Sequence, residues 1–291
     1  MPAELSVTHH RESVFQRHPV ASYFALTFAV SWTGALLVTA PHLLRGETIP
    51  KMSGLLMFPV MLVGPSLVGI LMTWFTCGRK GLSNLLARMR RLRVPAGWYA
   101  VLLIPPTLVL AVLFALKTFW SPIFAPNNFW VGVSFGCIAG FFEEIGWTGY
   151  AFPELSAKRN GFAAAIFLGV FWGIWHLPVV DYLGSATPHG AYWFRFFLAF
   201  TAAMTAMRVL ISWLSARTNS IALAQLMHAV STGSLVVFSP PRVSAAQETT
   251  WYAVYAVALW LTVAVLATAT SGSFSSPQLR DVPENTRNPF G

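Results

Sequence analysis

The chain has 291 residues, of which 55% are hydrophobic and only 10% charged, and its formal net charge is +9. Soluble domains carry about 25% charged residues, so this composition excludes an ordinary soluble domain and indicates a polytopic membrane protein. The positive charge does not indicate nucleic-acid binding, because its densest cluster, at 88–93, has no nucleic-acid module beside it.

Eight apolar segments follow one another along the chain, each long enough to cross a bilayer, which takes about 20 residues of helix. The first segment exceeds the usual length of a signal-peptide core, so we expect a retained helix there. The sequence therefore predicts an all-α polytopic membrane protein with about eight transmembrane helices. The predicted spans are 20–40, 54–76, 97–119, 129–150, 161–181, 191–214, 220–238 and 251–270.

These spans are expected to form a single transmembrane domain, residues 20–270, in which the motifs described below fall within 143–232. Residues 1–19 are a predicted polar N-terminal tail. Residues 271–291 are rich in Ser, Pro and charged residues, a composition that predicts a disordered C-terminal tail.

The loop at 78–96 predicts the orientation in the membrane. By the positive-inside rule this loop is cytoplasmic, and an even number of spans then places both termini on the same side. The leucines of the loop have helical spacing, which is typical of a short interfacial helix. We therefore expect an integral protein of a bacterial cytoplasmic membrane, with both termini cytoplasmic. The loop contains no acidic residue and six basic ones: Arg79, Lys80, Arg88, Arg90, Arg91 and Arg93.

Two adjacent glutamates, Glu143 and Glu144, interrupt the fourth predicted span. A charged side chain near the middle of a bilayer costs about 2.5–3.5 kcal/mol on insertion scales, so these residues are candidates for chemistry rather than for scaffolding. Adjacent helical side chains point about 100° apart. We therefore expect one glutamate to face an intramembrane polar cavity and the other a partner. The structural alternative is a pair satisfied only by hydrogen bonds to neighbouring helices.

Two histidines in later spans are further candidates. Glu143 and His176 are each about 16 residues from the turn between the fourth and fifth spans, so an antiparallel pair of helices would bring them to the same depth. His228 precedes Thr232 by one helical turn, which aims two donors in one direction, as an oxyanion site requires. The alternative for Thr232 is a hydroxyl that donates to the carbonyl of residue 228.

These residues carry a resemblance to a known family. The segments 143–155, 171–178 and 228–232 resemble, in this order, the motifs of the CAAX-processing and bacteriocin-processing membrane proteases, the CPBP or Abi family, which is related to the CAAX prenyl endopeptidases. The resemblance implies an intramembrane glutamate-dependent endopeptidase that cleaves a peptide bond near the membrane surface. Glu143 and His176 would activate a water molecule, and His228 with the residue at 232 would stabilise the oxyanion.

The chain departs from the family pattern at two positions. In the family's first motif the paired glutamates are followed, after three intervening residues, by an arginine, where this chain has Thr148. The family's third motif ends in asparagine, where this chain has Thr232. Without that arginine, either Arg208 or a neutral Glu144 would have to restore the charge balance. Thr232 can still donate a hydrogen bond, but from a shorter side chain.

Two other functions are compatible with the same residues. Two glutamates and two histidines could hold a metal, although neither Glu-x-x-His nor His-Glu-x-x-His spacing occurs here. A protein of this fold could also act without proteolysis, as an immunity protein, a chaperone or a lipid-modifying enzyme. We expect no metal and no other cofactor. The expected partners are a peptide or prenylated peptide and the lipid bilayer, without nucleic acid, and the sequence does not determine the oligomeric state.

Overall fold

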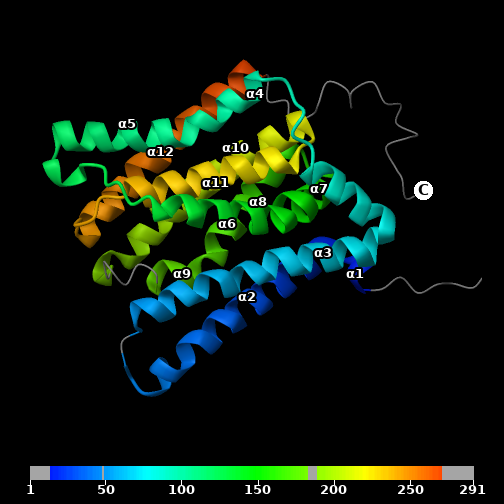
Figure 1. The fold of residues 1–291 in the computed structure, drawn as a ribbon, viewed down its shortest axis with the longest axis horizontal. Coiled ribbons are helices and arrows are strands. Elements are labelled where there is room, and N and C mark those ends of the chain that lie inside the picture. Colours follow the sequence, from blue (N-terminus) through cyan, green and yellow to red (C-terminus); the bar gives the residue numbers. More distant parts are fainter. Residues whose placement is uncertain (1–13, 48, 183–188, 271–291) are drawn as a thin grey trace, which may run out of the picture.

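The computed structural model describes residues 14–47, 49–182 and 189–270, and every regular element in these ranges is helical, as the apolar segments predict (Figure 1). The predicted C-terminal tail and most of the predicted N-terminal tail lie outside the described residues. The α-helices are α1 (Val14–Arg17), α2 (Pro19–Leu44), α3 (Lys51–Met89), α4 (Gly97–Ala100), α5 (Ile104–Phe119), α6 (Val131–Gly146), α7 (Phe152–Ser156), α8 (Gly161–Trp175), α9 (Leu177–Tyr182), α10 (Trp193–Thr218), α11 (Ile221–Phe238) and α12 (Ala245–Ala269).

Six helices in the described part of the chain are long and apolar enough to cross a membrane: Pro19–Leu44, Leu55–Met89, Gly97–Phe119, Gly190–Thr218, Ile221–Phe238 and Ala245–Ala269. The expected spans at 129–150 and 161–181 are built from shorter pieces, so the predicted count of eight is approximate.

Proline explains where these two segments break. The α6 helix passes into a π-helical turn at Trp147–Ala151, and α8 ends at Trp175 before the short α9 begins. Pro153 and Pro178 follow the two breaks. A proline has no backbone N–H to continue the hydrogen-bond ladder, and its ring clashes with the preceding turn.

The basic segment predicted to lie at the membrane surface is the kinked end of α3. Gly78 has φ 59° and ψ −152°, a conformation that breaks the helix direction and that side-chain-bearing residues rarely adopt. Figure 1 shows the end of α3 turning away from its main axis. The helical residues after Gly78 thus run in a new direction from the apolar part of α3.

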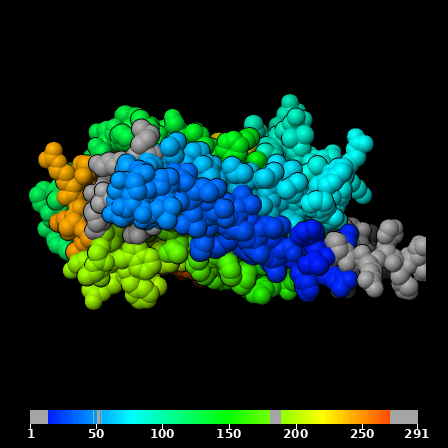
Figure 2. Space-filling model, turned by 90° about the horizontal axis from the view of Figure 1, so that it is seen from below, coloured from blue at the N-terminus to red at the C-terminus, as the bar shows by residue number. Residues whose placement is uncertain are grey.

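The two ends of the bundle differ in what they contain. The start of α2, the kinked end of α3 and α7 meet at one end, and α9, the end of α5 and the start of α12 lie at the other (Figure 1). Figure 2 shows α2 and α3 lying side by side along one face. The arginine-rich segment, 78–93, therefore marks one end of the molecule.

Close packing of α6 on α11 positions the glutamates. At Gly136 a Cβ atom would collide with the backbone carbonyl of Ala229, and at Gly140 with that of Gln225. Only glycine permits this backbone approach. Small residues at helix interfaces are the usual means of close packing within membranes, and here they bring the end of α6 against the middle of α11.

Candidate active site

Glu143 and Glu144 occupy the last turn of α6, where their side chains are 2% and 0% exposed. The close approach of α11 brings His228 beside both carboxylates. The two side chains then diverge: Glu143 lines a cavity, and Glu144 points into a cluster of hydrogen-bond donors. This divergence is what the helical geometry of adjacent residues predicts.

The Glu144 carboxylate accepts hydrogen bonds from three side chains. Two terminal nitrogens of Arg208 on α10 donate to it, one to each oxygen, both at 2.8 Å. Nδ1 of His228 donates to Oε1 at 2.7 Å, and the Thr148 hydroxyl donates to Oε2. A bidentate arginine is among the strongest partners of a carboxylate, so this buried charge is fully paired.

Arg208 supplies the cation that the family motif has at position 148. Its side chain is fully buried, and its guanidinium carbon lies 4.2 Å from the centre of the Trp172 ring. One of its nitrogens also lies 3.4 Å from the Thr148 hydroxyl. The arrangement favours substitution by Arg208 over a neutral Glu144.

Glu143 is held by two indoles on one of its oxygens. Nε1 of Trp172 donates to Oε2 at 2.7 Å, and Nε1 of Trp147 donates to the same atom at 3.2 Å. The other oxygen, Oε1, lies 4.0 Å from Nε2 of His228. The indoles therefore fix the carboxylate and leave Oε1 available for chemistry.

His176 caps the C-terminal end of α8 and also lines the cavity. Its Nδ1 lies 2.7 Å from the carbonyl oxygen of Trp172. A carbonyl only accepts, so Nδ1 carries a proton and Nε2 of the neutral ring is left as an acceptor. Trp172 thus joins the two predicted residues, because its backbone carbonyl accepts from His176 and its indole donates to Glu143.

His228 and Thr232 lie one turn apart on α11, and both line the cavity. Within the described residues the Thr232 hydroxyl makes no hydrogen bond to its own helix, in contrast to Thr205 and Thr218, which donate to the carbonyl four residues before them. The described residues therefore do not show the hydrogen bond to the carbonyl of residue 228 that the alternative for Thr232 requires.

A cavity of about 390 Å³ brings Glu143, His176, His228 and Thr232 together. It continues to residues at the ends of helices: Leu55 in α3, and Glu248 in α12, both at the end of the bundle opposite the arginine-rich segment. The rest of its wall is mainly apolar, as in Phe58, Phe129, Phe135, Val179, Val180, Phe196, Phe200, Met204, Leu235 and Val236. Glu144, Thr148 and Arg208 lie behind this wall.

Sequence reasoning missed three contributors to the site. Trp147 could have been found, because it lies four residues after Glu143 on the same helical face. Trp172 lies outside the predicted set, yet it donates to Glu143. His189 also lines the cavity, and its Nε2 lies 3.2 Å from Glu248 Oε2. No local pattern signals that last pair.

The arrangement of the carboxylates and histidines can be compared with what a bound metal ion would need. In the described ranges there is no cluster of three or more His, Cys, Asp or Glu side chains arranged to hold a metal ion. Both oxygens of Glu144 already accept from Arg208, which makes this carboxylate a poor ligand. Glu143 and the two histidines remain as the potential ligands that chelation would test.

The fold and this centre define a polytopic α-helical membrane protein with a buried glutamate–histidine site. Residues 125–233 match the family described as type II CAAX prenyl endopeptidase, Rce1-like. The chain is also similar to CAAX prenyl protease 2 of Methanococcus maripaludis, with 26% identity over 224 residues, which are 71% of this chain and 80% of that relative. These findings confirm the resemblance to the CAAX-processing proteases and support a membrane endopeptidase that acts on a peptide.

Proposed function

We propose that the protein is an intramembrane endopeptidase in which Glu143 activates a water molecule. The observation that carries this proposal is the division of labour between the two carboxylates. Glu144 is paired with Arg208, whereas Glu143 lines a cavity together with both histidines. A general base must be within reach of the proton that it removes, and Glu143 is the carboxylate in that position.

His176 and Glu143 form the water-activating side of the proposed site. Nε2 of His176 is left as an acceptor by the Nδ1 contact with the Trp172 carbonyl. An acceptor at this point can orient a water proton while Glu143 removes the other. The attacking oxygen then adds directly to the peptide carbonyl. The C–N bond breaks as Glu143 returns its proton to the leaving amine, so no covalent enzyme intermediate forms.

His228 and Thr232 form the oxyanion side. Nδ1 of His228 is bound to Glu144, so Nε2 can donate to substrate only when the ring is protonated. The oxyanion role proposed for His228 therefore requires the protonated form of its ring. The Thr232 hydroxyl adds a neutral donor one turn along the same helix.

The lining of the cavity and the distribution of charge are the basis for proposing what kind of substrate the protein takes and from which side it enters. The apolar wall suits a hydrophobic side chain or a prenyl group beside the scissile bond. The arginine-rich segment and both termini are proposed to be cytoplasmic, in a bacterial cytoplasmic membrane. The cavity extends toward the opposite end of the bundle, so the cleaved peptide would enter from the non-cytoplasmic side.

A cleavage assay tests this proposal. The full chain would be reconstituted in liposomes and given matched peptides, with and without a prenyl group, beside the Glu143→Gln variant. Cleavage by the wild type and its loss in the variant are expected. The assignment would be contradicted if the wild-type protein inserted and folded but cleaved neither peptide class nor membrane peptides extracted from cells.

A further inference from the structure

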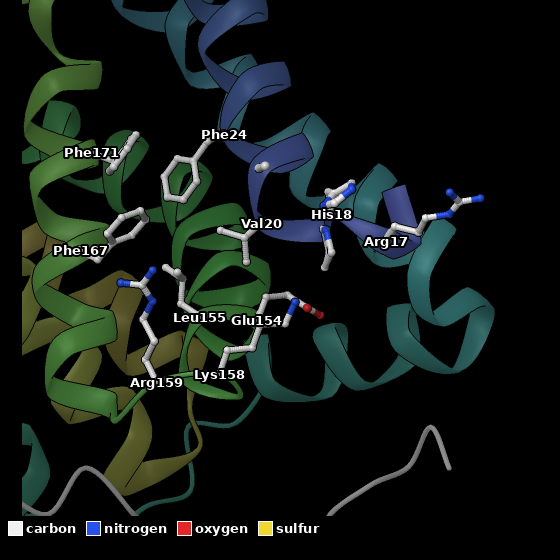
Figure 3. A pocket seen from close by; sticks show the side chains of 12 residues that line it. Arg17, His18, Val20, Phe24, Glu154, Leu155, Lys158, Arg159, Phe167 and Phe171 are labelled. Atoms are coloured by element: carbon white, nitrogen blue, oxygen red, sulfur yellow. The ribbon is translucent and has the colours of Figure 1, made fainter. Parts of the chain in front are cut away.

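A second cavity, of about 460 Å³, lies apart from the glutamate site, at the end of the bundle that carries the arginine-rich segment. Its walls come from the start of α2 and from the α7–α8 region. Figure 3 shows its side chains from close by. This cavity shares no lining residue with the glutamate cavity, so the two are separate binding spaces.

Basic side chains form the rim of this cavity. Arg17 and His18 come from the segment before α2, and Lys158 and Arg159 from the turn before α8, and all four are exposed. One acidic side chain, Glu154, shares the cavity. It is partly buried, and burial raises the pKa of its carboxyl while Lys158 acts in the opposite direction. Lys158 and Arg159 together carry more charge than the single carboxyl of Glu154.

An aromatic wall lies directly beneath these cations. The ring centres of Phe24 and Phe171 are 4.7 Å apart, and so are those of Phe167 and Phe171. The guanidinium carbon of Arg159 lies 4.7 Å from the centre of the Phe167 ring, and both side chains are labelled in Figure 3. A ligand in this cavity would meet positive charge at one end and an apolar surface at the other.

We propose that this cavity binds an anionic phospholipid of the surrounding bilayer. Its phosphate would lie between Lys158 and Arg159, and an acyl chain would run along the three phenylalanines. Basic pockets between helices at the membrane surface favour anionic headgroups. A free phosphate would leave the aromatic wall unused, and a zwitterionic lipid would bring a cationic choline group beside these cations along with its phosphate.

Native mass spectrometry of the delipidated full chain tests this proposal with three probes: phosphatidylglycerol, phosphatidylcholine and glycerol phosphate. Phosphatidylglycerol is expected to bind most tightly. Each cation near the surface contributes about a factor of five, so Lys158→Gln with Arg159→Gln should weaken it about 30-fold. The matched control is Arg90→Gln with Arg91→Gln, which removes the same charge from exposed residues at the same end, outside the cavity.

Two further variants test the shape of the cavity and its charge. Ala21→Trp should fill the cavity and weaken phosphatidylglycerol binding without altering charge, because Ala21 lines the wall and is exposed. Glu154→Gln should strengthen binding, since it removes the one repulsive carboxylate. Three outcomes would each overturn the proposal. The Arg90/Arg91 control could lose as much binding as the Lys158/Arg159 variant, or Ala21→Trp could bind normally. The third is that phosphatidylcholine or glycerol phosphate binds as tightly as phosphatidylglycerol.

Discussion

Arg208 on α10 donates to both oxygens of Glu144 on α6, across 64 positions of sequence. The pair stands beside Thr148, the position at which the related proteases have their own arginine. A bidentate arginine is among the strongest partners of a buried carboxylate. In this chain that cation comes from α10 and not from position 148.

Removing this cation should destabilise the protein. In Arg208→Met a fully buried carboxylate loses its partner, which costs about 3–5 kcal/mol in comparable pairs. The melting temperature in detergent should fall and any cleavage should be lost. Adding Thr148→Arg returns the cation to the family's position, so the double variant should recover part of both. The control is Arg195→Met, at an exposed position on the same helix. An Arg208→Met variant as stable as this control would contradict the pairing of Arg208 with Glu144.

Glu143→Gln should abolish the reaction without unfolding the protein. The amide keeps the size of the side chain and accepts the two indole hydrogen bonds, but it cannot act as a base. Turnover should fall by about 10²–10⁴, the usual contribution of a general base. Steady-state cleavage rates measure this, with Glu47→Gln in an exposed loop as the control. A Glu143→Gln variant that cleaves at the wild-type rate would remove Glu143 from this role.

The two variants at position 232 should differ in activity. Thr232→Val keeps the shape but removes the donor, and loss of one oxyanion donor costs about 2.7–4 kcal/mol in the transition state. Thr232→Asn restores the family's residue with a longer donor and should retain or raise the rate. The ratio kcat/KM for both variants measures the effect. Normal turnover by Thr232→Val would leave His228 as the single supported donor.

Chelation should leave activity intact if Glu143 acts on water without a metal. Prolonged treatment with a strong chelator, followed by elemental analysis, checks this on the purified protein. We expect no stoichiometric zinc or iron and unchanged cleavage. One metal per chain that is required for turnover would instead make Glu143 and the two histidines ligands.

Cysteine labelling in intact cells should establish which side of the membrane each end faces. In a background with Cys77 and Cys137 replaced by Ser, Asn285→Cys is expected to be protected from an impermeant thiol reagent. Arg242→Cys, in the α11–α12 turn near the mouth of the cavity, should react with it. The reverse pattern would place the cavity mouth on the cytoplasmic side, and labelling of both positions would change the number of spans.

Much of the fold could be predicted from composition alone, because long apolar segments must form helices to satisfy their backbone groups in a bilayer. The two central spans were less predictable. Pro153 and Pro178 mark where these two helices break, but the apolar length of the segments does not reveal it. Apolar length by itself therefore overstates the continuity of these two helices.

The sequence by itself determined that two carboxylates and two histidines lie within apolar segments, because placing charge there is costly enough to be conspicuous. It also identified the departures at Thr148 and Thr232. Only the tertiary structure decided that Arg208 neutralises Glu144, that two indoles hold Glu143, and that His189 faces the same cavity. These contacts join residues far apart in the chain, and no local periodicity specifies which helices meet or which side chains face each other.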